Sequence, residues 1–75
     1  MENAKFAVVD FVDEKTEDGY VVELVPMTWM SFHQGRWGCY YPRAASDTIR
    51  KWVEDEKPVN EKWKLHLNIE VLAWA

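Results

Sequence analysis

The sequence predicts a small α+β domain: a curled antiparallel sheet, or an SH3-like partial barrel, of order β-β-β-α-β with one helix. Three observations predict this class. Two β-branched and aromatic segments are joined by a polar loop, one later segment has helical spacing, and the C-terminal segment alternates apolar and polar residues. We expect residues 1–75 to form one small interaction domain, of a size that also suits the N-terminal part of a longer protein.

The first two strands are expected to form a hairpin. Residues 6–12 are apolar on both faces except at Asp10, which predicts a central strand covered on both sides. Residues 13–19 form an acidic loop that ends in glycine, and residues 20–25 predict the returning strand. Pro26 is expected to end that strand because proline cannot donate a hydrogen bond to a neighbour.

The middle of the chain shows no clear period between residues 27 and 38. Gly35 and Gly38 flank Arg36 and Trp37 there, a spacing typical of an exposed loop tip. A third short strand is expected at residues 39–41, immediately before a proline.

A helix is expected next. Ser46 or Asp47 is the predicted N-cap, because both side chains can accept from free backbone N–H groups. Ile49, Trp52 and Val53 have the spacing of one buried helical stripe. A proline at position 58 then prevents the helix from continuing.

The C-terminal segment predicts self-association. Apolar and polar residues alternate from Trp63 to Val71, and then Leu72 and Trp74 put apolar side chains on the polar face. Thirteen extended residues would measure about 43 Å, whereas a globule of this length is roughly 30 Å across. The strand must therefore bend sharply or project. We expect it to project, so that Val71, Leu72 and Trp74 bind a second copy and form a homodimer.

Composition excludes several classes of protein. The net charge of −4 argues against a nucleic-acid-binding domain. No apolar run is long enough to span a bilayer and no secretory signal is present, so an intracellular protein is expected. Cys39 is the sole cysteine, and no Cys/His spacing suggests zinc, so no disulfide, metal or cofactor is expected.

Residues 24–46 predict a contact surface. They contain none of the thirteen acidic residues, but they hold two arginines and five aromatic residues. Because Trp, Tyr and Arg are enriched at interface hot spots, Arg36, Trp37, Trp29 and Tyr41 are the predicted partner-binding residues. The alternative is that several of these aromatic side chains only fill a small core.

A sharper alternative is an aromatic cage for a methylated lysine of a partner peptide. The cation would be surrounded by Trp29, Trp37, Tyr40 and Tyr41. The carboxylate beside it would come from Asp10 or Glu23. Neighbouring strand residues point to opposite faces, however, so Tyr40 and Tyr41 cannot both line one cage on a regular strand.

Catalysis is not expected. Cys39 is the available nucleophile, with His33 or His66 as a base, but the spacing supplies no third group to orient that base. Cys39 fits better as a small buried hydrophobic residue. The sequence therefore predicts a non-enzymatic module.

Four blocks carry a resemblance to a known group of proteins. They are residues 6–11, residues 25–29, residues 39–42, and the closing strand from Trp63 through residues 69–72. Together they resemble the N-terminal module of poorly characterised animal proteins, largely from insects, whose remaining regions are often transposon-related or chromatin-associated, of the BEN type. The group has Trp at the place of Tyr41 and Pro at the place of Arg43. The resemblance implies a nuclear module of a chromatin- or transcription-associated protein, with no catalytic residues.

Overall fold

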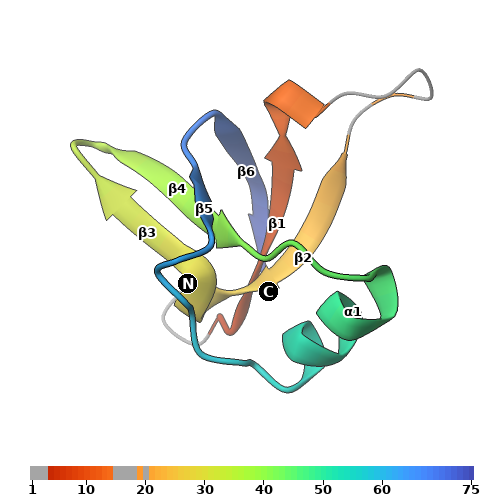
Figure 1. Cartoon of the computed structure of the whole chain (residues 1–75). Helices are drawn as coiled ribbons and strands as arrows, with labels where there is room; N and C mark the ends of the chain where they lie inside the picture. The colour runs from red at the N-terminus through yellow and green to blue at the C-terminus, as the bar shows by residue number, and fades with distance from the viewer. Residues whose placement is uncertain (1–3, 15–18, 20) are drawn as a thin grey trace.

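The computed structural model describes residues 4–14, 19 and 21–75, and it contains two three-stranded antiparallel sheets and one α-helix (Figure 1). The predicted α+β class is confirmed. The predicted order of four strands and one helix is wrong, because the described residues form six strands. The two sheets do not close into a barrel within that part of the chain. The elements are β1 (Phe6–Phe11), η1 (Val12–Glu14), β2 (Val22–Pro26), η2 (Met27–Trp29), β3 (Met30–His33), β4 (Arg36–Tyr41), α1 (Ser46–Glu54), β5 (Lys64–His66) and β6 (Ile69–Trp74).

The first sheet has the order β2-β1-β6, so β1 is its central strand. The predicted hairpin of β1 and β2 is confirmed, although Tyr20 and residues 15–18 lie outside the described part. Ala7, Val9 and Phe11 point to the inner face and are buried. The outer face is only partly covered by the described residues, because Val22 and Leu24 on β2 are 45% and 46% exposed.

A β-bulge in β6 explains why the alternation of apolar and polar residues breaks near the C-terminal end. Val8 pairs with Ala73 and Val9 pairs with Val71, so Leu72 is an extra residue in β6. An inserted residue reverses the alternation of side chains beyond it. Leu72 itself is 51% exposed.

Trp74 returns to the inner face because of that bulge. It lies opposite the buried Ala7 and packs against the hydrophobic core. The last residue is also held by β1, since Ala75 O accepts hydrogen bonds from Lys5 N and Phe6 N, both at 2.8 Å. The expected projection of this segment is wrong: the chain bends between β5 and β6, and β6 pairs with β1 of the same subunit.

The second sheet has the order β3-β4-β5 and includes a hairpin that the sequence did not predict. Its turn consists of Gln34 and Gly35, whose φ angles are 48° and 81°. Two consecutive positive φ angles define the type I′ turn that suits the twist of a hairpin. Arg36 and Trp37 therefore lie on β4 and not in a loop tip, as expected from the sequence.

The helix α1 and the core agree with the predicted stripe. Val53 is buried, and Ile49 and Trp52 pack against the core. The predicted N-cap is wrong, because Ser46 is already the first helical residue and Ala45 occupies the cap position without a side-chain hydrogen bond. No helix in the described residues is long and apolar enough to cross a membrane.

Candidate functional site

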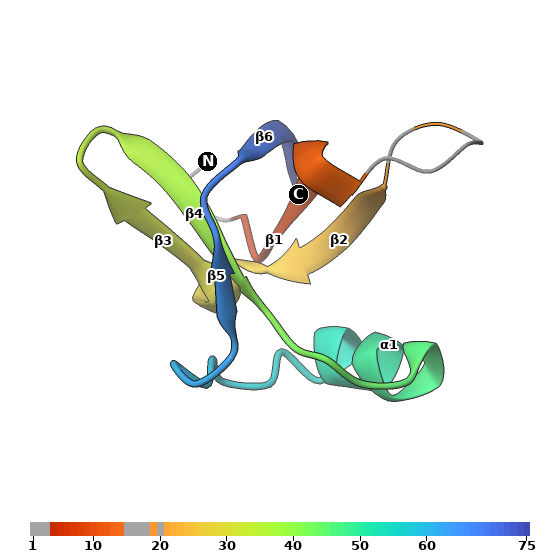
Figure 2. The same cartoon turned by 45° about the horizontal axis from the view of Figure 1, so that its top comes forward.

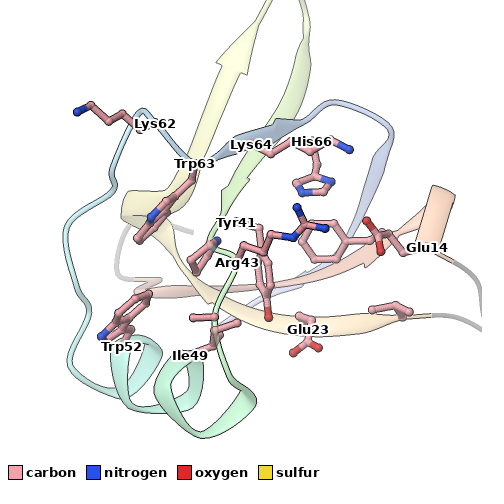
Figure 3. A pocket seen from close by; sticks show the side chains of 14 residues that line it. Glu14, Glu23, Tyr41, Arg43, Ile49, Trp52, Lys62, Trp63, Lys64 and His66 are labelled. Carbon is pink, nitrogen blue, oxygen red and sulfur yellow. The ribbon is translucent and has the colours of Figure 1, made fainter.

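An aromatic cleft of about 660 Å³ opens between the two sheets. Residues of β2, β5 and α1 line it (Figure 3). Figure 2 shows how these three elements are arranged. Both strands are edge strands, β2 of the first sheet and β5 of the second, so the cleft occupies the place where the sheets fail to meet. It is lined by Phe11, Glu14, Val21, Glu23, Tyr41, Pro42, Arg43, Ala44, Ile49, Trp52, Lys62, Trp63, Lys64 and His66.

Three aromatic side chains at the α1 end form a connected cluster around Trp29. The rings of Trp52 and Trp63 are stacked, with centroids 5.9 Å apart. The rings of Tyr41 and Trp63 each meet Trp29 edge to face, at 6.0 and 5.1 Å. Trp29 is itself fully buried, and its Nε1–H donates to Lys57 O at 2.7 Å. The core thus fixes the aromatic wall of the cleft.

Trp52 already holds a cation of its own chain. Lys57 Nζ lies 4.9 Å from the centroid of the Trp52 ring, which is the geometry of a cation–π contact. The same ring stacks on Trp63. Trp52 therefore closes one end of the cleft and does not stand as a free wall of a cage.

The charged side chains of the cleft are divided between its borders. Glu14 and Glu23 come from the β1–β2 side, whereas Lys62 and Lys64 come from the β5 side (Figure 3). Arg43 reaches into the space between them from the segment after β4. A ligand that spans the cleft therefore meets carboxylates at one border and ammonium groups at the other.

Two titratable groups on the floor have shifted pKa values. Burial, together with the charges of Glu23 and Cys39, raises the pKa of Tyr41 to about 12, so its phenol stays neutral. Burial and the neighbouring Lys64 lower the pKa of His66 from 6.5, although two nearby carboxylates oppose the shift. At neutral pH both side chains offer uncharged hydrogen-bonding groups.

The four residues predicted to bind a partner do not form one site. Tyr41 lines the cleft, but Trp29 is a core residue. Trp37 packs at 5.2 Å against Trp74, away from the cleft, and Arg36 donates to the Leu67 carbonyl. The alternative that part of this aromatic stretch fills the core therefore holds for Trp29.

The predicted cage is not assembled either. Of its residues, only Tyr41 and the carboxylate of Glu23 lie at the cleft, because Trp29 is buried and Trp37 lies on the β3–β4 hairpin. Sequence reasoning missed Trp52 and Trp63 as cleft residues. Their apolar spacing had placed them in a buried helical stripe and on a strand face, and only the fold brings them together.

The residues predicted for self-association are also divided. Val71 and Trp74 are partly buried against the core of their own subunit. Leu72 is the exposed member of the three. It lies on β6, an edge strand, so it is accessible to a second chain.

Cys39, the nucleophile that the sequence offers, is buried. Cys39 lies opposite His66 in the β4–β5 register, but its Sγ–H points to the Tyr40 carbonyl oxygen at 3.5 Å. Burial raises the pKa of Cys39 to about 12, so the thiol is protonated at neutral pH. Within the described residues, no three His, Cys, Asp or Glu side chains are placed to hold a metal ion.

Comparisons of the chain with protein-family models, with curated proteins and with solved structures found no match.

Proposed function

We propose that this domain is a non-enzymatic protein-interaction module that binds an extended peptide segment of another protein in the aromatic cleft. The observation that carries the proposal is the position of the cleft: it lies between two sheet edges and has an aromatic wall at one end. Peptide-binding domains commonly combine an exposed strand edge with pockets for side chains.

The cleft can accommodate an extended peptide because edge strands border it. Its apolar side chains, such as Ile49 and Trp63, are interleaved with charges of both signs. A peptide can bury apolar side chains there, place its charged groups at the borders and hydrogen-bond to a strand edge. The proposed ligand is thus still a partner peptide, but a methyl-lysine cage is not part of the proposal. The Trp52 ring, which could have formed one wall of such a cage, already contacts Lys57.

Selection of peptides from a random display library tests this function. Selected peptides should bind the domain in calorimetry, and Trp52→Ala should weaken binding by more than about tenfold. Phe32→Ala is the matched control, because Phe32 is an exposed aromatic residue on β3, away from the cleft. Equal losses in both variants, or no selectable peptide, would reject the cleft as the binding site.

A second candidate function is self-association through the β6 edge, with Leu72 at the contact. The exposed leucine on an edge strand favours it, because such edges readily pair with another chain. The chain should then have a dimer mass at ~100 µM, a concentration at which a micromolar dimer is populated. Leu72→Ala should give a monomer while Leu67→Ala, also at an exposed leucine, should not. A monomer mass for the unaltered chain would exclude this dimer.

We also infer an SH3-like partial barrel as the finer description of the fold, with its open side between β2 and β5. The resemblance noted in the sequence adds a nuclear, chromatin- or transcription-associated setting to the proposed interaction. Nuclear enrichment of a fluorescent fusion that carries the full natural protein would support that setting, and exclusion from the nucleus would contradict it.

A further inference from the structure

Strand β2 has a free hydrogen-bonding edge. Phe11 N donates to Val21 O at 2.9 Å, which fixes the phase of the β1–β2 ladder. In an antiparallel pair, every second residue directs its N–H and C=O at the neighbouring strand. Residues 21, 23 and 25 therefore face β1, whereas Val22 and Leu24 direct their backbone groups away from the sheet. The hydrogen bonds found among the described residues do not involve those outward groups.

The side chains along this edge alternate in character. Val22 and Leu24 point to the outer face and are 45% and 46% exposed. Glu23, between them, points to the inner face and lies at the border of the cleft, where it influences Tyr41 (Figure 3). An apolar edge strand with a free ladder is a template for one more strand.

We propose that a partner segment binds as an added strand along Val22–Glu23–Leu24, with a basic residue facing Glu23 and an apolar residue on each side of it. This proposal rests on the proposed function and adds the binding mode and the chemistry of the peptide. The basic side chain enters the cleft beside Glu23 and Glu14, while its two neighbours pack on the outer face against Val22 and Leu24.

Charge decides between a foreign segment and a second copy. In the register of two antiparallel β2 strands that is centred on Glu23, Val22 of one copy exchanges hydrogen bonds with Leu24 of the other. That register places Glu23 directly opposite its own equivalent, at the close spacing of a non-hydrogen-bonded pair. Like charges directly opposite each other destabilise a sheet. Shifting the register toward the end of β2 brings in Pro26, which has no N–H to donate. The edge therefore suits a segment with a lysine or arginine at this position.

The test uses the display-selected peptides, resynthesised with backbone N-methyl groups on alternate residues. Methylation in one frame removes the N–H groups that face β2 and should weaken binding by more than about tenfold, whereas the other frame should have little effect. If both frames bind like the unmodified peptide while Trp52→Ala still abolishes binding, strand addition is wrong and the cleft function stands. If no peptide binds at all, the proposed function fails as well.

Two protein variants provide independent readouts. Leu24→Pro removes an outward N–H that the fold itself does not use, so it should weaken peptide binding; circular dichroism and the thermal midpoint verify folding. Glu23→Lys should weaken binding of a peptide with a central lysine, and exchanging that lysine for glutamate should restore it. Unchanged affinity of the Glu23→Lys variant would overturn the basic specificity, and a light-scattering dimer abolished by Leu24→Pro would show that a second copy is the occupant.

Discussion

Trp29 shows how a single side chain organises both the core and the candidate site. It is fully buried, and its indole N–H donates to the Lys57 carbonyl at 2.7 Å. Tyr41 and Trp63, which line the cleft, both pack against its ring. A domain of this size has little core to spare, so a large aromatic residue at the centre contributes a substantial share of the buried area.

Replacing Trp29 with Phe should therefore destabilise the fold. The variant loses the hydrogen bond to Lys57 and leaves space in the core, so we expect the free energy of unfolding to fall by about 2–3 kcal/mol. Urea denaturation monitored by circular dichroism measures it. Trp37→Phe is the control, because Trp37 is only partly buried, and its cost should be clearly smaller. Equal costs would show that Trp29 has no special role.

His66 gives the stability a dependence on pH. Burial and Lys64 lower its pKa in the fold from 6.5, so the unfolded chain binds the proton more tightly than the folded chain does. The free energy of unfolding should then decrease as the pH falls below about 6.5, and the loss should end below the folded pKa.

His66→Gln should remove this part of the pH dependence, because glutamine does not titrate. Urea titrations between about pH 7.5 and 5 compare the two proteins. The neighbouring Lys64 has the same sign of charge as protonated His66 and disfavours it. Lys64→Gln should therefore reduce the pH dependence of stability without abolishing it, because burial also contributes. An identical pH profile for the unaltered protein and His66→Gln would contradict the assignment.

Part of the candidate site was predictable from single residues. Tyr41 was a predicted partner-binding residue of the acid-free aromatic stretch, and Glu23 was one of two candidate carboxylates for the predicted cage; both lie at the cleft. Trp52 and Trp63 did not stand out. Their spacing is the same whether they fill a core or border a cleft, and only the positions of α1 and β5 decide between the two.

At the scale of the elements, the sequence predicted those whose pattern is local and regular. The β1–β2 hairpin and α1 follow from alternation and from helical spacing. Strand β3 was missed because Met30–His33 has no clear alternation and the nearby glycines suggested a loop. Gly38 is in fact buried in β4, where an added Cβ would lie 2.9 Å from Leu67 Cδ2. That glycine permits close packing and does not mark a turn.

The bulge in β6 explains why the orientation predicted for Trp74 from regular alternation was wrong. A period of two assigned Trp74 to the polar face, and one inserted residue returns it to the core. Deleting Leu72 should make the pairing with β1 regular and keep Trp74 on the inner face opposite Ala7. We expect the free energy of unfolding to fall by about 1 kcal/mol or less, whereas Trp74→Ala, which removes a large side chain packed on the core, should cost about 3 kcal/mol.

Leu72→Ala is the matched control for that deletion. It keeps the extra residue and removes only an exposed side chain, so stability should change by about 0.5 kcal/mol or less. Urea denaturation at low protein concentration separates this effect from any dimer. A deletion variant that loses as much stability as Trp74→Ala would contradict the pairing of Val8 with Ala73 and of Val9 with Val71.

The β3–β4 turn allows a gain in stability. Gln34 has a φ angle of 48°, in the left-handed region, which is unfavourable for most residues that carry a Cβ. Asparagine adopts this region more readily than glutamine does. Gln34→Asn should raise the free energy of unfolding by about 0.5 kcal/mol. Gly35→Ala, at a φ angle of 81°, should lower it by about 1 kcal/mol. Thermal unfolding of the pair checks both signs, and a stabilising Gly35→Ala would refute the turn type.

At the scale of the molecule, the two sheets share a small core and separate from each other on one side. Strands β4 and β6 are joined by the contact of Trp37 and Trp74, while β2 and β5 leave the cleft between them. A chain that closed this gap would gain buried surface and lose its free edge. The open side is thus the costly feature of the architecture, and it coincides with the candidate binding site.

The hydrogen bonds from Lys5 and Phe6 to Ala75 have a consequence for how such a unit can be combined with others. They hold Lys5 and Ala75 together at one end of the first sheet, with Ala75 O 2.8 Å from both backbone nitrogens. A domain with adjacent ends can be inserted into an exposed loop of a host protein without separating the two ends of that loop. The host would then be attached at β1 and β6, whereas the cleft is bordered by the other edge strand of that sheet, β2, and by β5.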